Sequence, residues 1–204
     1  MSVAGAVYVA AWISGLLVVP SAPSASGPAG VLHDFYVGHV PVIVVQALLV
    51  HGLAGIALAV LAWTLPLAAG VRGRDAALVR LTGWAAAAVS IAQVGLALVA
   101  ALGAGSATPA ETRALVHAVD LADAVKLVLL AGFVAAATAV AARAGVAPHW
   151  LRIAAAALVV LLPLGAASFV VPGALLGLLL VVSLPVLLLW TGAIAYQVGR
   201  HSLR

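Results

Sequence analysis

The chain has 204 residues, of which 66% are hydrophobic and 7% are charged, and its formal net charge at pH 7 is +4. Soluble domains are roughly 45–50% apolar and about 25% charged, so this composition excludes an ordinary soluble protein and indicates one integral membrane domain over the whole chain, 1–204. The arginines fall in short loops rather than along one face, which argues against nucleic-acid binding, and the absence of cysteine excludes disulfides, thiolate catalysis and iron–sulfur clusters.

Six apolar segments follow one another along the chain, each close to the roughly 20 residues that a membrane-spanning helix needs. They predict an all-α, polytopic transmembrane helical bundle with about six spans. The predicted spans are 3–20, 41–64, 81–103, 114–142, 153–171 and 174–197. The first segment partly resembles a secretory signal, but it lacks a basic start, which favours a retained helix. The longest linker, from Ser21 to Gly38, is rich in Pro, Ser, Gly and Ala before it becomes aromatic and charged.

Every second linker carries arginine, which predicts the topology. The arginines after the second, fourth and sixth spans are Arg72, Arg74, Arg80, Arg143, Arg152, Arg200 and Arg204. By the positive-inside rule these regions are cytoplasmic, so both termini are expected inside a bacterial cytoplasmic membrane. Trp63, Trp84 and Trp150 fall at the same ends of the spans, where aromatic residues anchor helices at the membrane interface.

The fourth segment has a clear helix start. Thr108, Pro109 and Glu111 occupy the positions of an N-cap, a first-turn proline and a capping-box acid, so we expect the helix to begin near Pro109.

The same segment contains the only lysine of the chain, Lys126, together with Asp123, Asp120 and His117 at three-residue intervals. Asp123 and Lys126 are one helical turn apart and form the natural ion pair. Ionisable groups at membrane depth are costly and mark ion or substrate pathways. A buried pair that only fixes helix packing is an equally good interpretation.

Polar residues on the second and third segments complete a candidate interior. Gln46 lies at the depth of Lys126, and Gln93 lies near the middle of its span. His39 and Gln46 share a face of an ideal helix, whereas His51 is rotated by about 140° from Gln46, so one ligand face is not expected to hold all three. The plainer interpretation is that the glutamines bridge helices and that His51 bonds a glutamine or a backbone carbonyl.

A second group of polar residues is expected at the outer end: His33, Asp34, His39, His117 and Asp120. Imidazoles and carboxylates suit zinc or copper, so His33, Asp34, His39 and His117 are weak metal candidates. Their spacing matches no known ligand signature, which favours a solvated outer surface. A haem would need a second histidine at the depth of His51, and the sequence supplies no clear one.

The segment 146–152, Val-Ala-Pro-His-Trp-Leu-Arg, opens the fifth span after a short basic loop. Its Pro148, Trp150 and Leu151 resemble the Pro-x-Trp-Leu feature of a group of small six-span bacterial integral membrane proteins classed as a domain of unknown function. The arginine-bearing loop between the second and third spans is similar as well. The resemblance implies architecture alone, with no activity, cofactor or site residue attached.

Three functional hypotheses follow. The first is a transport-type or small-ligand-binding protein that uses Asp123 and Lys126, with Gln46, His51 and Gln93 lining its interior. The second is a haem- or metal-binding redox protein that uses His39, His51 or His117, and the third is a non-catalytic partner subunit. Catalysis is not favoured, because the sequence has no G-x-S-x-G, H-E-x-x-H or P-loop motif. The expected partners are the lipid bilayer and a second copy or another membrane protein; the cofactor stays open.

Overall fold

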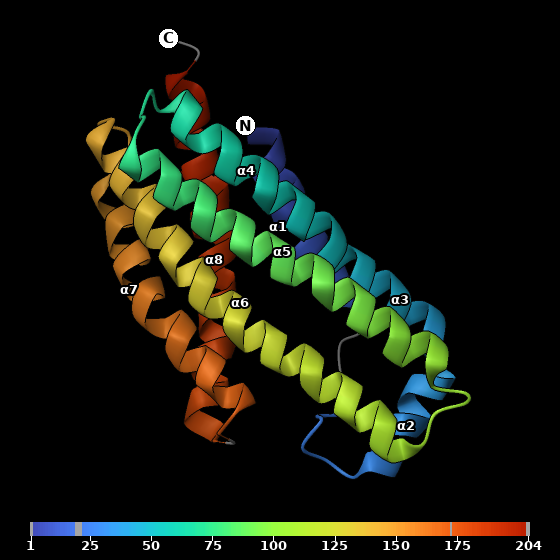
Figure 1. The fold of residues 1–204 in the computed structure, drawn as a ribbon. Helices are drawn as coiled ribbons and strands as arrows, with labels where there is room; N and C mark the ends of the chain where they lie inside the picture. The colour runs from blue at the N-terminus through green and yellow to red at the C-terminus, as the bar shows by residue number, and fades with distance from the viewer. Residues whose placement is uncertain (1, 19–21, 172, 203–204) are drawn as a thin grey trace.

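The computed structural model describes residues 2–18, 22–171 and 173–202. Every regular element in these ranges is helical, which confirms the all-α prediction (Figure 1). The α-helices are α1 (Ser2–Val18), α2 (Ala29–Gly38), α3 (Val40–Ala47), α4 (Ala54–Ala68), α5 (Arg74–Gly103), α6 (Pro109–Arg143), α7 (His149–Ala166) and α8 (Ala174–His201). A π-helical segment, Leu48–Leu53, joins α3 to α4, and a 3-10 turn, Ala167–Phe169, ends α7.

Five helices are long and apolar enough to cross a membrane. They are Val40–Ala68, which runs through the π-helical segment, and Arg74–Gly103, Pro109–Arg143, His149–Phe169 and Ala174–His201. These five overlap the second to sixth predicted spans, with helix ends that differ from the predicted ones by up to seven residues. The first predicted span corresponds to the shorter apolar helix α1, and its residues 19 and 20 lie outside the described part of the chain.

The long helices lie side by side in one elongated bundle (Figure 1). Helix α5 packs on α4 and α6, α7 packs between α6 and α8, and α1 packs on α4 and α8. Phe133 of α6 and Trp190 of α8 meet edge to face in the core, with ring centroids 6.1 Å apart. Close approach of α5 needs Gly83, because a Cβ there would lie 2.4 Å from the Ala62 Cβ of α4.

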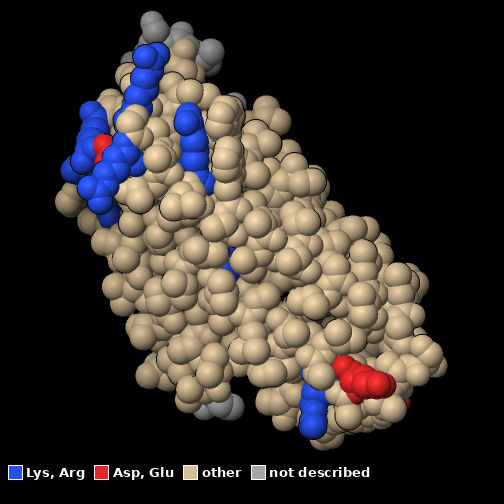
Figure 2. All heavy atoms as spheres, in the orientation of Figure 1, with Lys and Arg blue, Asp and Glu red and all other residues tan. Residues whose placement is uncertain are grey.

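The two ends of the bundle differ in charge. Figure 2 shows that most of the visible Lys and Arg side chains gather at one end, where the α4–α5 and α6–α7 turns and the last turns of α8 lie. At this end Trp63 and Trp84 stack with ring centroids 5.5 Å apart, and Arg80 lies 4.4 Å above the Trp63 ring. Asp75 at the start of α5 forms an ion pair with Arg143 at the end of α6. Helix α1 begins at this end too, since Gly5 lies against Ala195 of α8.

The segment 21–38 was expected to be a linker, and this expectation is wrong for its second half. Residues 29–38 form α2, which packs on α6 and buries Leu32. A helix this short owes its stability to tertiary packing rather than to local preference, so the Pro- and Ser-rich stretch before it gave the misleading signal. Helix α2 lies at the end of the bundle opposite the arginines (Figure 1).

Candidate ion-pair site within the bundle

The start of α6 sets the position of the charged residues. The Thr108 hydroxyl accepts a hydrogen bond from the Glu111 N–H at 3.3 Å, and the Thr108 N–H donates to Glu111 Oε2 at 2.7 Å. Pro109 occupies the first turn, so the predicted helix start is confirmed. At about 1.5 Å per residue, Lys126 lies about 25 Å along this 35-residue helix, close to its middle.

The ammonium of Lys126 is buried, with 2% of the residue exposed. Its Nζ donates to Gln93 Oε1 of α5 at 2.9 Å, and it forms the predicted ion pair with Asp123 one turn earlier on α6. It also lies 3.2 Å from His51 Nδ1. An ammonium carries three donors and no acceptor, so His51 Nδ1 accepts and the neutral imidazole holds its proton on Nε2.

Two further side chains, Gln93 and Trp12, stabilise the network of contacts around the Lys126 ammonium. Gln93 is fully buried, and its Nε2 donates to the Val119 carbonyl of α6 at 3.2 Å, so both ends of the amide bridge α5 to α6. The predicted interhelical role of Gln93 is therefore confirmed. The face of Trp12 on α1 lies 5.5 Å from Lys126 Nζ, which adds a cation–π contact. The network thus joins α1, the π-helical segment, α5 and α6.

The π-helical segment explains why Gln46 and His51 line one cavity although an α-helix would separate them. Its hydrogen bonds run from residue i to i+5, so each turn holds more residues and each residue advances by less than the roughly 100° of an α-helix. The separation of about 140° predicted for an ideal α-helix therefore does not apply here, and His39 is not among the residues that line this cavity. Single π-turns inside α-helices occur frequently at functional sites.

A cavity of about 250 Å³ lies beside the ion pair. Its polar lining consists of Asp123, His51 and Gln46 at one part of the wall. The apolar lining comes from Trp12, Leu16, Val50, Val119, Leu127, Phe169, Leu180 and Leu184. The side chain of Asp123 is 22% exposed, whereas that of Lys126 is 3% exposed. The carboxylate therefore reaches the cavity, and the ammonium stays behind it.

A larger cavity of about 670 Å³ lies toward the end of the bundle that carries α2. Tyr36, His117 and Asp120 line it together with the segment 22–26 and the start of α8. Burial, and secondly the nearby Asp120 carboxylate, raise the pKa of Tyr36 to about 12. Val119 and Phe169 line both cavities, so the cavity beside the ion pair and the outer cavity are neighbours.

The remaining outer candidates do not join this arrangement. His33 Nδ1 lies 3.0 Å from the Thr112 hydroxyl. His39 is exposed, stacks on Phe35 with ring centroids 4.4 Å apart and donates from Nδ1 to the Phe35 carbonyl at 2.9 Å. Across the ranges that the structure describes, no group of three His, Asp or Glu side chains is placed to hold a metal ion. The weak metal candidates His33, Asp34, His39 and His117 are therefore not brought together.

Two residues of the site were not singled out from the sequence. Trp12 lies in the middle of its apolar segment rather than at an end, and this unusual place for a membrane tryptophan was the available signal. Phe169 carried no comparable signal, because its position depends on how the end of α7 turns toward α6.

Fold and site together define an all-helical chain with five membrane-length apolar helices and a buried Lys–Asp pair beside a cavity. No family model, curated protein or solved structure matches it.

Proposed function

We propose that this chain is a transport-type, multi-pass protein of the bacterial cytoplasmic membrane that binds a small ligand or ion at the Asp123–Lys126 pair. One observation carries the proposal. The carboxylate of a buried ion pair reaches a cavity, and that cavity shares Val119 and Phe169 with a larger one toward the outer end. Charged groups inside a membrane that face a cavity rather than lipid mark ion and substrate pathways.

The proposed topology has six spans, with both termini and the arginine-rich end in the cytoplasm. The gathering of arginine and tryptophan at one end of the bundle supports it. Helix α1 has 17 residues, about 25 Å, so it crosses a bilayer core of about 30 Å only with its flanking residues or with local thinning. The resemblance at Pro148, Trp150 and Leu151 belongs to the same proposal about architecture.

The polar groups in the wall of the cavity beside the ion pair indicate the class of ligand. An ionised carboxylate only accepts hydrogen bonds, and a pocket that is apolar apart from a few polar groups orients its ligand by those groups. Asp123 therefore favours a ligand that presents a positive charge or hydrogen-bond donors, and the simplest such species is a proton or a small cation. Gln46 offers both donor and acceptor groups beside it.

The test is the flux of protons and small cations into liposomes that contain the purified protein. Asp123→Asn keeps an oxygen acceptor for Lys126 but removes the charge at the cavity, and we expect the flux to fall at least about tenfold. The matched control is Asp75→Asn, because Asp75 is also paired with a cation but lies at the arginine-rich end. That variant should retain the wild-type flux.

If the Asp123→Asn variant has the same flux as the wild type, Asp123 has no coupling role. If the wild-type protein gives no more flux than empty liposomes, the transport proposal itself is contradicted. A purely structural pair makes a different prediction: exchanging the charges, with Asp123→Lys and Lys126→Asp together, then preserves stability and function. The redox and partner-subunit hypotheses stay predictions, and no contact among the described residues favours either.

A further inference from the structure

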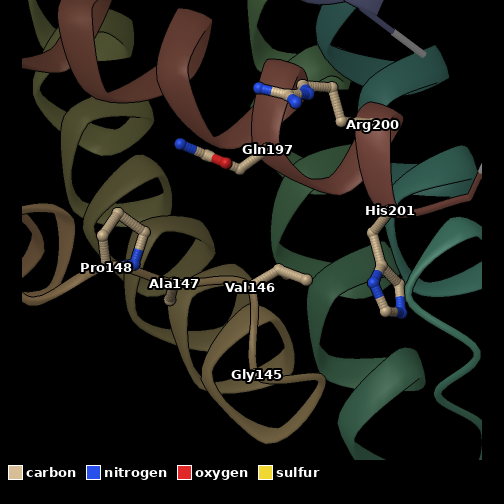
Figure 3. A pocket seen from close by; sticks show the side chains of 7 residues that line it. All are labelled: Gly145, Val146, Ala147, Pro148, Gln197, Arg200 and His201. Atoms are coloured by element: carbon tan, nitrogen blue, oxygen red, sulfur yellow. The ribbon is translucent and has the colours of Figure 1, made fainter.

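A separate cavity of about 410 Å³ lies at the arginine-rich end (Figure 3). Gln197, Arg200 and His201 from the last turns of α8 form one side, and the turn 145–148 between α6 and α7 forms the other. The volume falls in the range of about 300–1,000 Å³ that is usual for small-molecule sites. Lys126 lies about 25 Å from Arg143 along α6, so this cavity is remote from the ion pair.

The turn that forms one wall is fixed by its own hydrogen bonds. Gly145 has a positive φ of +71°, the Gly145 N–H donates to the Ala142 carbonyl, and the Val146 N–H donates to the Ala141 carbonyl. This is a Schellman ending of α6. Pro148 follows and begins α7, so the wall is a rigid turn rather than a loose loop.

The lining of the cavity is basic and rich in donors. Arg200 donates one hydrogen bond, to the Tyr196 hydroxyl at 3.4 Å, and a guanidinium has five N–H donors. Gln197 and His201 add an amide and an imidazole, and none of the described lining residues is Asp or Glu. Helix α7 begins beside Pro148, so its dipole adds a weaker positive potential. The cavity therefore suits an oxyanion.

The position of the cavity indicates where that anion comes from. The exposed Trp63, Trp84 and Trp150 lie at this end, and such aromatic residues sit at the level of the lipid headgroups. Basic pockets between membrane helices on the cytoplasmic side bind the headgroups of anionic lipids. We propose that this cavity binds the phosphate headgroup of an anionic phospholipid, with Arg200 as its main ligand. The proposal needs the bundle to lie in a bilayer but not the transport role of Asp123.

The test uses delipidated protein in a neutral detergent and a fluorescent short-chain phosphatidylglycerol, with the matching phosphatidylcholine for comparison. The wild type should bind phosphatidylglycerol at least about tenfold more tightly. Arg200→Gln should abolish that preference, whereas Arg152→Gln, which removes an exposed arginine of the same end outside the cavity, should retain it. Ala147→Glu places a negative charge on the opposite wall without touching α8, and it should abolish the preference as well.

Circular dichroism and gel filtration establish that each variant is folded. If Arg200→Gln does not fold, Ala147→Glu decides the question alone. Equal preference in the wild type and in folded Arg200→Gln or Ala147→Glu overturns the proposal, as does an equal loss in Arg152→Gln, which indicates unspecific attraction. A second measurement adds inorganic phosphate, at the same concentration as the lipid, to the protein with bound phosphatidylglycerol. Full displacement of the lipid contradicts the proposal that the anion is a lipid headgroup, and continued binding of the lipid supports it.

Discussion

Replacing Lys126 by methionine should destabilise the protein, because it removes the cation from a network of buried acceptors. Methionine has a similar length and is apolar, so the change isolates the ammonium. Asp123 loses its ion-pair partner, and Gln93 and His51 each lose a donor. Breaking one side of a buried ion pair costs about 3–5 kcal/mol. We expect a value near the lower end, about 3 kcal/mol, because the Asp123 side chain remains 22% exposed to the cavity.

The assay is reversible unfolding in mixed detergent micelles, followed by tryptophan fluorescence. The decisive comparison is a double variant, Lys126→Met with Asp123→Leu. Replacing both members of a buried pair by apolar residues is often neutral, so the double variant should be more stable than Lys126→Met alone. If the stability losses of Lys126→Met and Asp123→Leu, measured separately, simply add up in the double variant, the two residues are not coupled and the reasoning is refuted.

Two further predictions concern packing and titration. Gly83→Ala should cost about 1–3 kcal/mol in the same unfolding assay, because its Cβ would lie 2.4 Å from that of Ala62; Gly95→Ala in the same helix meets no atom within 4 Å and should change the stability by less than about 1 kcal/mol. Tyr36 should ionise near pH 12 in an absorbance titration, and Tyr36→Phe should remove that step. Since the folded-state pKa is raised, the stabilisation from neutral Tyr36 is complete below pH 10 and is lost as the pH rises toward 12, so a Tyr36 step at pH 10 contradicts its burial.

Local sequence signals predicted the parts of the structure that depend on neighbouring residues. The start of α6 followed from Thr108, Pro109 and Glu111, whose hydrogen bonds involve only residues three apart. The pairing of Asp123 with Lys126 followed from helical spacing alone. Apolar length was enough to place the five long helices.

Contacts between helices were beyond the reach of these signals. Trp12 reaches Lys126 because of how α1 packs on the π-helical segment, α4 and α8, and an apolar pattern does not encode that packing. Helix α2 forms on the surface of α6, so its own ten residues were insufficient to predict it. An ideal α-helix sets Gln46 and His51 about 140° apart, and the apolar pattern does not encode the π-helical segment between them.

The π-helical segment at Leu48–Leu53 separates two properties of its helix, length and phase. The continuous stretch Val40–Ala68 has 29 residues, more than a bilayer requires, so it would remain able to span if all of it were regular α-helix. With the same residues in a regular α-helix, however, His51 would lie about 140° from Gln46 around the helix axis. The hydropathy of the stretch would be unchanged, although Gln46 and His51 would no longer line the same part of the cavity wall beside Asp123. The shape of that wall therefore depends on the hydrogen-bond pattern of this stretch, and its capacity to span a membrane depends on its length and composition.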